Sequence, residues 1–424
     1  MRVLIVNTSE KTGGAAVAAN RLMDALNNNG VKAKMLVRDK LTDRLTVIGL
    51  RQSWRQRWNF LWERWCVFWH LHGHRQHLFE IDMANMGSDI TRLPEFQEAD
   101  VVHLHWINQG MLSLRNIRKI LDSGKAVVWT MHDLWPASSL CHYARTCNKF
   151  KSHCQFCPLL PGGGSEDDLS STVWNRKVRM LKDRSIHFVT CSRWLAGEAK
   201  KSALLKGQHI YNVPNPIDTR IFRPLEKKKA RHDCGLPYNK RYILFVSQRV
   251  TDERKGMDYF VTAVDKLVEA HPEMKETTGI AILGGHSEEF EHRLALPVYP
   301  LGYVNDERQI VNIYNAASLF VLPSLEDNLP NTIMEAMACG VPCAGFKVGG
   351  IPEMIDHRRN GYVAEFRNAD DLATGMYWVL DVCDYQKVSN EAVTKVAHSY
   401  SQTNIALRYI EVYNEALALK HYKL

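Results

Sequence analysis

Residues 323–350, PSLEDNLPNTIMEAMACGVPCAGFKVGG, decide the fold of this chain because they read as loop, helix, strand and turn in immediate succession. The apolar run Leu319–Leu322 before them predicts a buried strand, and Val341–Phe346 predicts the next one. Thr332 is expected to cap the helix between them, with Glu335 in the spacing of a capping box. Two strands that each lead through a loop into a helix predict a parallel α/β sheet, with a ligand site beyond the strand ends.

Composition bounds the class of protein and its surroundings. A length of 424 residues with 45% hydrophobic residues favours two domains, each with a core of its own. Ten scattered cysteines do not form the framework of a secreted disulfide protein, and the strand-like start shows no signal peptide. No run of about 18 uncharged apolar residues is present. A cytoplasmic protein is therefore expected, and its net charge of +8 favours anionic partners.

The stretch around Glu335 resembles the nucleotide-sugar loop of retaining glycosyltransferases of family 4, in which two glutamates usually frame seven residues. Glu335 matches the second glutamate and is followed by Ala-Met-Ala-Cys-Gly-Val-Pro. Asp327 stands at the first position with Glu326 beside it, and either acid fits the first role. The resemblance covers Gly13–Gly361, is weakest at 38–98, and is greatest to bacterial capsule and exopolysaccharide enzymes of the colanic-acid type.

This resemblance implies the GT-B fold, an α/β architecture of two Rossmann-like domains that face an interdomain cleft. Residues 1–216 would form the N-terminal acceptor-binding domain, and residues 217–400 the C-terminal nucleotide-sugar-binding domain. Residues 401–424 are expected to form a helix that packs back on the N-terminal domain. The run NPIDTRIFRP, with its prolines, resembles the family's connection between the two domains.

A basic loop follows the strand predicted at 242–247. Arg249, Arg254 and Lys255 precede a predicted helix N-terminus, which suits a diphosphate. The family uses an arginine and a lysine here, and Arg249 with Lys255 is the preferred pair, with Arg254 as the alternative. The other donor-binding residues that the resemblance implies lie in loops at predicted strand ends: Gly13, Gly14, Val304, Glu326, Leu329, Pro330, Asn331 and Glu335.

The predicted catalytic residues are His132, Asp327 and Glu335. His132 follows the strand predicted at 125–130 and is itself followed by an aspartate, which is a better position for a reacting group than that of most lone histidines. The segment WTMHDLWP resembles the family's acceptor-domain strand and loop, and implies that His132 contacts the donor sugar near the reacting carbon. Glu335 suits the hydroxyls of a ribose, and Asp327 or Glu326 a hydroxyl of the sugar.

Four cysteines follow in the spacing C-x5-C-x6-C-x2-C: Cys141, Cys147, Cys154 and Cys157. Four soft ligands within 17 residues predict a structural zinc site, with free thiols and disulfides as the alternatives. No cofactor is expected for catalysis.

Five of the eleven tryptophans fall within 51–80, at steps of four, four, three and four residues. On a helix they would occupy an arc of roughly 80°. Arginines flank them, so the segment suits a helix that lies on a membrane surface. An ordinary core face and a protein-docking face remain the alternatives.

The predicted function is that of a retaining hexosyltransferase. It would move a sugar from a nucleotide-diphosphate sugar to a glycan or a polyprenyl-diphosphate-linked acceptor in surface polysaccharide synthesis, on the inner face of the plasma membrane. The alternatives are a nucleotide-sugar epimerase or hydrolase of GT-B fold, and a catalytically silent glycan- or nucleotide-binding subunit. No nucleic-acid partner is expected. The sequence leaves the base and sugar of the donor, the acceptor, the linkage and the oligomeric state open.

Overall fold

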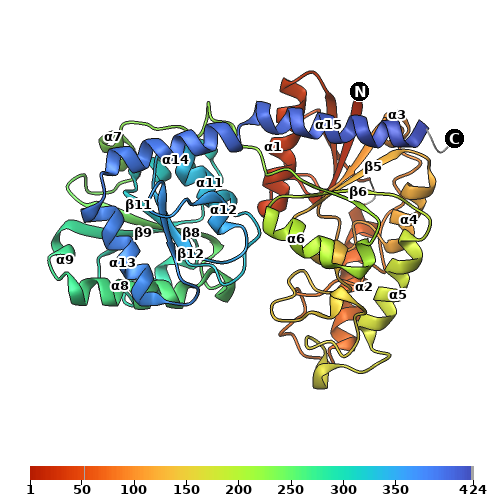
Figure 1. The fold of residues 1–424 in the computed structure, drawn as a ribbon, viewed down its shortest axis with the longest axis horizontal. Helices are drawn as coiled ribbons and strands as arrows, with labels where there is room; N and C mark the ends of the chain where they lie inside the picture. Colours follow the sequence, from red (N-terminus) through yellow and green to blue (C-terminus); the bar gives the residue numbers. More distant parts are fainter. Residues whose placement is uncertain (52, 422–424) are drawn as a thin grey trace. The chain divides into compact units, whose positions relative to one another are not determined.

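The computed structural model describes residues 1–51 and 53–421. Gln52, within the predicted membrane segment 51–80, and residues 422–424, within the predicted terminal helix, lie outside the described residues. The chain divides into two compact units, one of residues 1–215 with 405–424 and one of residues 216–404, here called unit 1 and unit 2. Each unit is built around one parallel sheet with helices on both faces (Figure 1).

The sheet of unit 1 has seven strands in the order β3-β2-β1-β4-β5-β6-β7. Its strands are β1 (Arg2–Ser9), β2 (Lys32–Asp39), β3 (Val47–Gly49), β4 (Val101–Leu104), β5 (Ala126–Met131), β6 (His187–Thr190) and β7 (His209–Asn212). The direction of strand succession reverses between β1 and β4, which pair in parallel with Val3 opposite Val101. A crevice is expected beyond the carboxyl ends of these two strands.

Both faces of the unit 1 sheet are buried, as the nearly continuous apolar strands require. Val3 and Ile5 pack on the face covered by α1 (Gly14–Asn28) and α15 (Gln402–His421), whereas Leu4 and Val6 belong to the core on the opposite face. The remaining helices of unit 1 are α2 (Ser53–His70), α3 (Pro94–Glu98), α4 (Leu114–Asp122), α5 (Leu169–Leu181) and α6 (Arg193–Lys201), with short helical turns at Trp135–Ala137, Lys149–Lys151, Pro161–Gly163 and Ala203–Leu205.

The sheet of unit 2 has six strands in the order β10-β9-β8-β11-β12-β13. They are β8 (Arg241–Arg249), β9 (Thr278–Gly285), β10 (Val298–Gly302), β11 (Leu319–Leu322), β12 (Cys343–Phe346) and β13 (Gly361–Ala364). Here the succession reverses between β8 and β11, where Leu319 lies opposite Ile243. The strand predicted at Leu319–Leu322 is confirmed to the residue.

Helices α8 (Met257–Ala270) and α13 (Ala369–Tyr377) cover one face of this sheet, and α11 (Asn331–Ala338) and α14 (Tyr385–Ser399) cover the other (Figure 1). The other helices of unit 2 are α7 (Lys227–Asp233), α9 (Met274–Thr277), α10 (Glu307–Ala316) and α12 (Ile351–Met354), with short turns at Glu253–Lys255, Ser287–Phe290 and Trp378–Val382. Two Rossmann-like α/β units are therefore confirmed. Within residues 1–51 and 53–421, no helix is both long and apolar enough to cross a membrane.

Candidate functional site

Two predicted site residues of unit 2 meet where the strand order reverses. Lys255 lies beyond β8 and Asp327 beyond β11, and Lys255 Nζ donates a hydrogen bond to Asp327 Oδ2 at 2.6 Å. Ser324 Oγ donates to the same oxygen at 3.3 Å. The carboxyl ends of strands beside such a reversal are the usual place for a ligand in an open α/β sheet. The structure thus joins two residues that are 72 positions apart in sequence.

Two glycines allow the loops at this point to approach each other. Gly256 has φ +74°, and a Cβ atom there would lie 1.9 Å from the carbonyl oxygen of Pro323. Gly349 has φ +57°, and its Cβ would lie 1.8 Å from the carbonyl oxygen of Asp327. Any side chain at either position would push the backbones apart. The glycines therefore fix the loop that carries Asp327 against both of its neighbours.

Asp327 and Glu326, the two candidates for the first acid of the motif, have different surroundings. Asp327 is buried, and its carboxylate accepts hydrogen bonds from Lys255 and Ser324. Glu326 is half-buried, and the ammonium group of Lys255 pairs with its neighbour instead. A charge-assisted hydrogen bond of this kind holds the Asp327 carboxylate in a fixed position.

Glu335 is buried on α11, where its Oε2 accepts a hydrogen bond from the Tyr314 hydroxyl at 2.8 Å. The predicted capping box is wrong. Helix α11 begins at Asn331, one residue before Thr332, with Pro330 at the capping position and no capping hydrogen bond from the side chain of that residue. Pro330 can occupy the start of a helix because it has no N–H to satisfy. The carboxylate of Glu335 therefore contacts α10 through the Tyr314 hydroxyl.

The three predicted cations have different surroundings. Arg249, at the end of β8, is exposed, and within the described residues its guanidinium has no carboxylate partner. Arg254 donates from Nη2 to Asp252 Oδ2 at 2.9 Å, and its carbonyl accepts from Leu325 N at 2.7 Å. Arg254 thus helps to hold its own loop. Arg249 faces solvent, and Lys255 pairs with Asp327. The choice of Arg249 with Lys255 as the diphosphate-binding pair stays a prediction.

The remaining predicted donor residues of unit 2 also lie beyond strand ends. Val304 follows β10, and Leu329 and Pro330, both buried, lead into α11 at Asn331. In unit 1, Gly13 has φ +90° at the capping position of α1, and Gly14 is the first residue of that helix. Among the described residues other than its chain neighbours, none lies within 4 Å of a Cβ placed on Gly13, so the backbone there is open to a ligand.

His132 lies directly after β5, at the carboxyl edge of the unit 1 sheet, as predicted. Its Nε2 is 2.9 Å from Nδ1 of His105, and the Cys191 thiol lies 3.7 Å from its Nδ1. Burial lowers the pKa of His132 to about 4, although the carboxylate of Asp133 opposes the shift. At neutral pH the imidazole therefore carries no charge and can exchange hydrogen bonds with a sugar hydroxyl.

A buried network of ionisable residues beside His132 was not predicted from the sequence. It consists of Glu63, Arg64, Asp82, Asp133 and His142. His142 lies between the two aspartates, 2.7 Å from Asp133 Oδ2 and 2.8 Å from Asp82 Oδ2. Burial favours neutral His142, but the two carboxylates raise its pKa to about 10. Arg64 on α2 pairs with Asp82, and Asp82 contacts His142. His142 in turn contacts Asp133, so the network connects α2 to the residue next to His132.

A second group that sequence reasoning missed lies at the centre of the unit 1 sheet. The ring nitrogens of His103 lie 2.7 Å from the Tyr413 hydroxyl and 2.7 Å from Thr130 Oγ1. The Tyr409 hydroxyl lies 2.9 Å from the same Thr130 oxygen. Burial, with His132 nearby, lowers the pKa of His103 to about 3, so this histidine is a neutral core residue. The two tyrosines come from α15, whose residues from 405 onward belong to unit 1.

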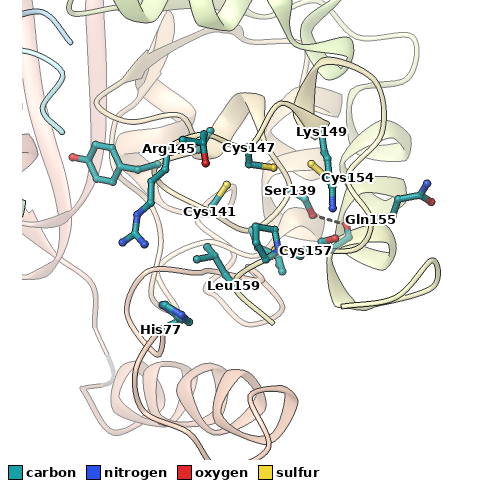
Figure 2. A pocket seen from close by; sticks show the side chains of 16 residues that line it. His77, Ser139, Cys141, Arg145, Cys147, Lys149, Cys154, Gln155, Cys157 and Leu159 are labelled. Atoms are coloured by element: carbon teal, nitrogen blue, oxygen red, sulfur yellow. Dashed lines mark hydrogen bonds between the residues drawn. The ribbon is translucent and has the colours of Figure 1, made fainter. Parts of the chain in front are cut away.

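The four cysteines of the predicted zinc site line one cavity of about 260 Å³ (Figure 2). Burial raises the pKa of Cys141 and of Cys154 to about 12. All four are free thiols, so the disulfide alternative is not what the structure shows. Within the described residues, no three His, Cys, Asp or Glu side chains are grouped closely enough to hold a metal ion. Zinc binding therefore stays a prediction, which metal analysis of the purified protein would test.

Two family models match the chain. One, described as Glycosyltransferase Family 4, matches residues 12–221, and the other, described as Glycosyl transferases group 1, matches residues 240–381. The fold is similar to that of sucrose-phosphate synthase from Thermosynechococcus elongatus, with a TM-score of 0.68, 16% identity and 99% of both chains covered. The chain is a glycosyltransferase of the GT-B type.

Two further proteins are similar to this glycosyltransferase along most of its length. An uncharacterized glycosyltransferase of Methanocaldococcus jannaschii is 27% identical over 366 residues, which cover 80% of this chain and 90% of that protein. Anabaena HepE in complex with UDP-glucose has a TM-score of 0.62 at 15% identity, with 98% of this chain and all of that one covered.

Proposed function

We propose that this glycosyltransferase moves a hexosyl group from a nucleotide-diphosphate sugar to a glycan acceptor with retention of anomeric configuration. The observation that carries the proposal is the contact between Lys255 and Asp327 where the unit 2 strand order reverses. A cation beside a carboxylate suits a ligand that has a diphosphate at one end and sugar hydroxyls at the other. HepE, which is similar in fold, was solved with UDP-glucose, and this supports a nucleotide-sugar donor here.

The cations stabilise the leaving group. When the bond between the sugar and the diphosphate breaks, negative charge builds on the β-phosphate. Arg249 and Lys255 supply positive charge for it, and the loop ahead of α11 supplies backbone N–H groups. Lys255 Nζ lies 2.6 Å from Asp327 Oδ2, so a bound diphosphate competes with Asp327 for the ammonium group. The Asp327 carboxylate then becomes available to accept a hydrogen bond from a sugar hydroxyl.

Glu335 of unit 2 and His132 of unit 1 each have a separate role in the proposal. The Tyr314 hydroxyl fixes one carboxylate oxygen of Glu335, which keeps the group oriented to accept hydrogen bonds from the ribose hydroxyls. His132 is neutral, and the role that the family resemblance implies for it is a hydrogen bond to a sugar hydroxyl. The acceptor hydroxyl forms the new bond to the anomeric carbon on the face from which the diphosphate leaves. Its proton passes to a phosphate oxygen, so atoms and charge balance without a covalent enzyme intermediate.

The acceptor that we propose is a growing surface glycan carried on a polyprenyl diphosphate at the inner face of the plasma membrane. The exposed tryptophans of α2 support this assignment, because an enzyme that acts on a lipid-linked substrate must work at the membrane surface. The core-face alternative for this helix is wrong, since all five tryptophans are exposed by 38% to 72%.

Thermal unfolding with a panel of nucleotide diphosphates and nucleotide sugars tests the donor site. A donor present at about 100 times its Kd stabilises the fold by about 2.7 kcal/mol. For a unit of this size the midpoint should rise by roughly 5 to 11 °C. The rise should disappear in Glu335→Ala and persist in the matched control Glu391→Ala, where the glutamate pairs with Arg359 at the surface.

If no nucleotide shifts the midpoint, or if Glu335→Ala shifts as the wild type does, the donor site is assigned wrongly. Product analysis then separates the enzymatic alternatives. Transfer requires an acceptor, whereas a hydrolase or an epimerase consumes or converts the donor alone. The anomeric configuration of the product, read by NMR, tests retention directly.

A further inference from the structure

Helix α2 presents a continuous row of tryptophans to solvent. The ring centroids of Trp58, Trp62, Trp65 and Trp69 follow one another at 5.8, 5.1 and 6.0 Å. Trp54 continues the row at the N-terminal end and is 72% exposed. An exposed apolar row of this extent is unusual on a water-facing surface and marks a site of interaction.

The side of α2 opposite the tryptophans packs on the rest of unit 1. Gln56 and Asn59 are buried and lie within 3.5 Å of the Ser88 hydroxyl, while Val67 belongs to the core. Glu63 is also buried. Because Glu63 is the one acidic residue of 51–69 and is buried, the exposed charged residues of this segment are all arginines: Arg51, Arg55 and Arg57. The tryptophan row is therefore accompanied by positive charge only.

A groove of about 950 Å³ opens beside the N-terminal end of this row, here called the arginine groove. Trp54 and Trp58 line it together with cationic side chains from α2, α4 and the segment before α3. The charged residues that line it are Arg55, Arg92, Arg115, Lys119 and Asp89.

The charge of the arginine groove is largely uncompensated. Lys119 Nζ is 2.6 Å from Asp89 Oδ2, so the single acid is already paired. Arg55, Arg92 and Arg115 are exposed, and in the part of the chain that the structure describes none of them has an ion-pair or hydrogen-bond partner. Three guanidinium groups without carboxylates around one groove match a phosphate, which arginine binds through paired N–H donors.

We propose that the arginine groove binds the phosphate headgroup of an anionic phospholipid while the tryptophan row of α2 lies in the interfacial layer of the same bilayer. Indole rings favour this layer because one edge is apolar and the N–H can meet water or a headgroup. The inference rests on the proposed action at a membrane, and adds the site, the lipid class and the residues that select it. An acidic protein partner would give the arginines an occupant but would leave an uncharged row of indoles unexplained.

Vesicle co-sedimentation tests the proposal with the full chain. Vesicles of phosphatidylcholine alone are compared with vesicles that also contain phosphatidylglycerol. The test variant is the triple substitution Arg55→Gln, Arg92→Gln and Arg115→Gln. Each arginine near an anionic surface is worth about fivefold in binding, so three should amount to about 100-fold.

The matched control removes the same charge from unit 2. Lys228→Gln, Lys229→Gln and Arg308→Gln change three exposed cations that, within the described residues, have no acidic partner. This control should retain most of the binding to phosphatidylglycerol vesicles. A second variant, Trp58→Ser with Trp65→Ser, should lose binding to both kinds of vesicle, because insertion of the indoles does not depend on lipid charge.

Equal loss in the groove triple and in the control triple would overturn the proposal, since it would mean that net charge alone attracts the chain. Binding that does not depend on phosphatidylglycerol would overturn it as well. The donor-induced thermal shift is measured on the same variants. It should persist in all of them, so failure of the membrane site and failure of the donor site give different results.

Discussion

Replacement of Asp82 by asparagine should destabilise unit 1 strongly. Asp82 is fully buried and pairs with two cationic groups, the Arg64 guanidinium and the His142 imidazole at 2.8 Å. The asparagine side chain has nearly the same shape as the aspartate but carries no charge. The perturbation therefore isolates the electrostatic part of the buried network.

The size of the effect follows from what remains after the change. Breaking a buried ion pair costs about 3 to 5 kcal/mol. Arg64 keeps hydrogen bonds from Nη1 to the carbonyl oxygens of Leu78 and Ile81, at 2.6 and 3.2 Å, and His142 keeps Asp133. We therefore expect the lower end, about 3 kcal/mol. For a unit of this size the unfolding midpoint should fall by roughly 6 to 12 °C.

The assay is thermal unfolding followed by near-UV circular dichroism, with Asp122→Asn as the control. Asp122 pairs with Arg118 and Arg184 at the surface, so its loss should cost less than about 1 kcal/mol. Midpoints that fall equally little in Asp82→Asn and Asp122→Asn would refute the reasoning, because they would show that the network contributes no more than surface pairs.

The pH dependence provides a second check with a definite sign. Burial opposes the charge on His142, but Asp133 and Asp82 raise its pKa to about 10, above the ordinary value of 6.5. A raised pKa in the folded state stabilises the fold fully below about pH 6.5, and this contribution is lost as the pH rises towards 10. The part of the wild type's advantage over Asp82→Asn that comes from the Asp82–His142 pair should therefore be lost between these pH values. A difference that is constant up to pH 10 would contradict the assignment.

Three other substitutions test the donor site. Lys255→Ala should lower kcat/KM by about 100-fold in a transfer assay, because it removes positive charge from the leaving diphosphate; unchanged turnover would exclude Lys255 from that role. Tyr314→Phe should weaken donor binding by about tenfold in calorimetry, because one carboxylate oxygen of Glu335 loses its hydrogen bond, and an unaltered Kd would show that the hydroxyl does not matter. Gly349→Ala should lower the unfolding midpoint more than Gly235→Ala does. Both glycines have positive φ, but only at Gly349 would the Cβ collide with a backbone oxygen, at 1.8 Å. Equal losses would contradict this explanation.

Most of the architecture could be predicted because its signals are local. The apolar run at 319–322 and the polar loop after it fix β11 and its carboxyl end, and the tryptophan spacing fixes the helix of α2. Once two strands are known to be parallel, their loops must lie at one edge of a sheet. That rule is what brings Lys255 and Asp327 together from opposite ends of a long segment.

The buried network could not be predicted, because nothing local distinguishes its charges from surface charges. Glu63 and Arg64 are adjacent in a helix that is rich in arginine, and only tertiary packing buries both. Burial and the nearby Asp82 raise the pKa of Glu63 to about 8, although Arg64 opposes this. The capping pattern at Thr332 is misleading for a different reason. The proline at the preceding boundary starts α11 one residue earlier than the capping pattern alone suggests.

The tryptophan row could be recognised from spacing, but its exposure could not. Periodicity shows that five indoles share one side of a helix and does not show whether that side faces core or solvent. The decisive observation is that Gln56, Asn59 and Glu63 occupy the buried side. A sequence in which the polar residues are inside and the indoles outside departs from the usual pattern, and this departure points to an interaction surface.

The place of α15 has a consequence for how the chain is made. Residues 405–421 complete the core of unit 1, where Tyr413 meets His103 across 310 positions of sequence. During synthesis, unit 2 is complete once Asn404 has left the ribosome, whereas the β1–β7 sheet still lacks one covering helix. The domain that is synthesised first therefore finishes folding last, and until then the sheet face that α15 covers is exposed to chaperones and proteases.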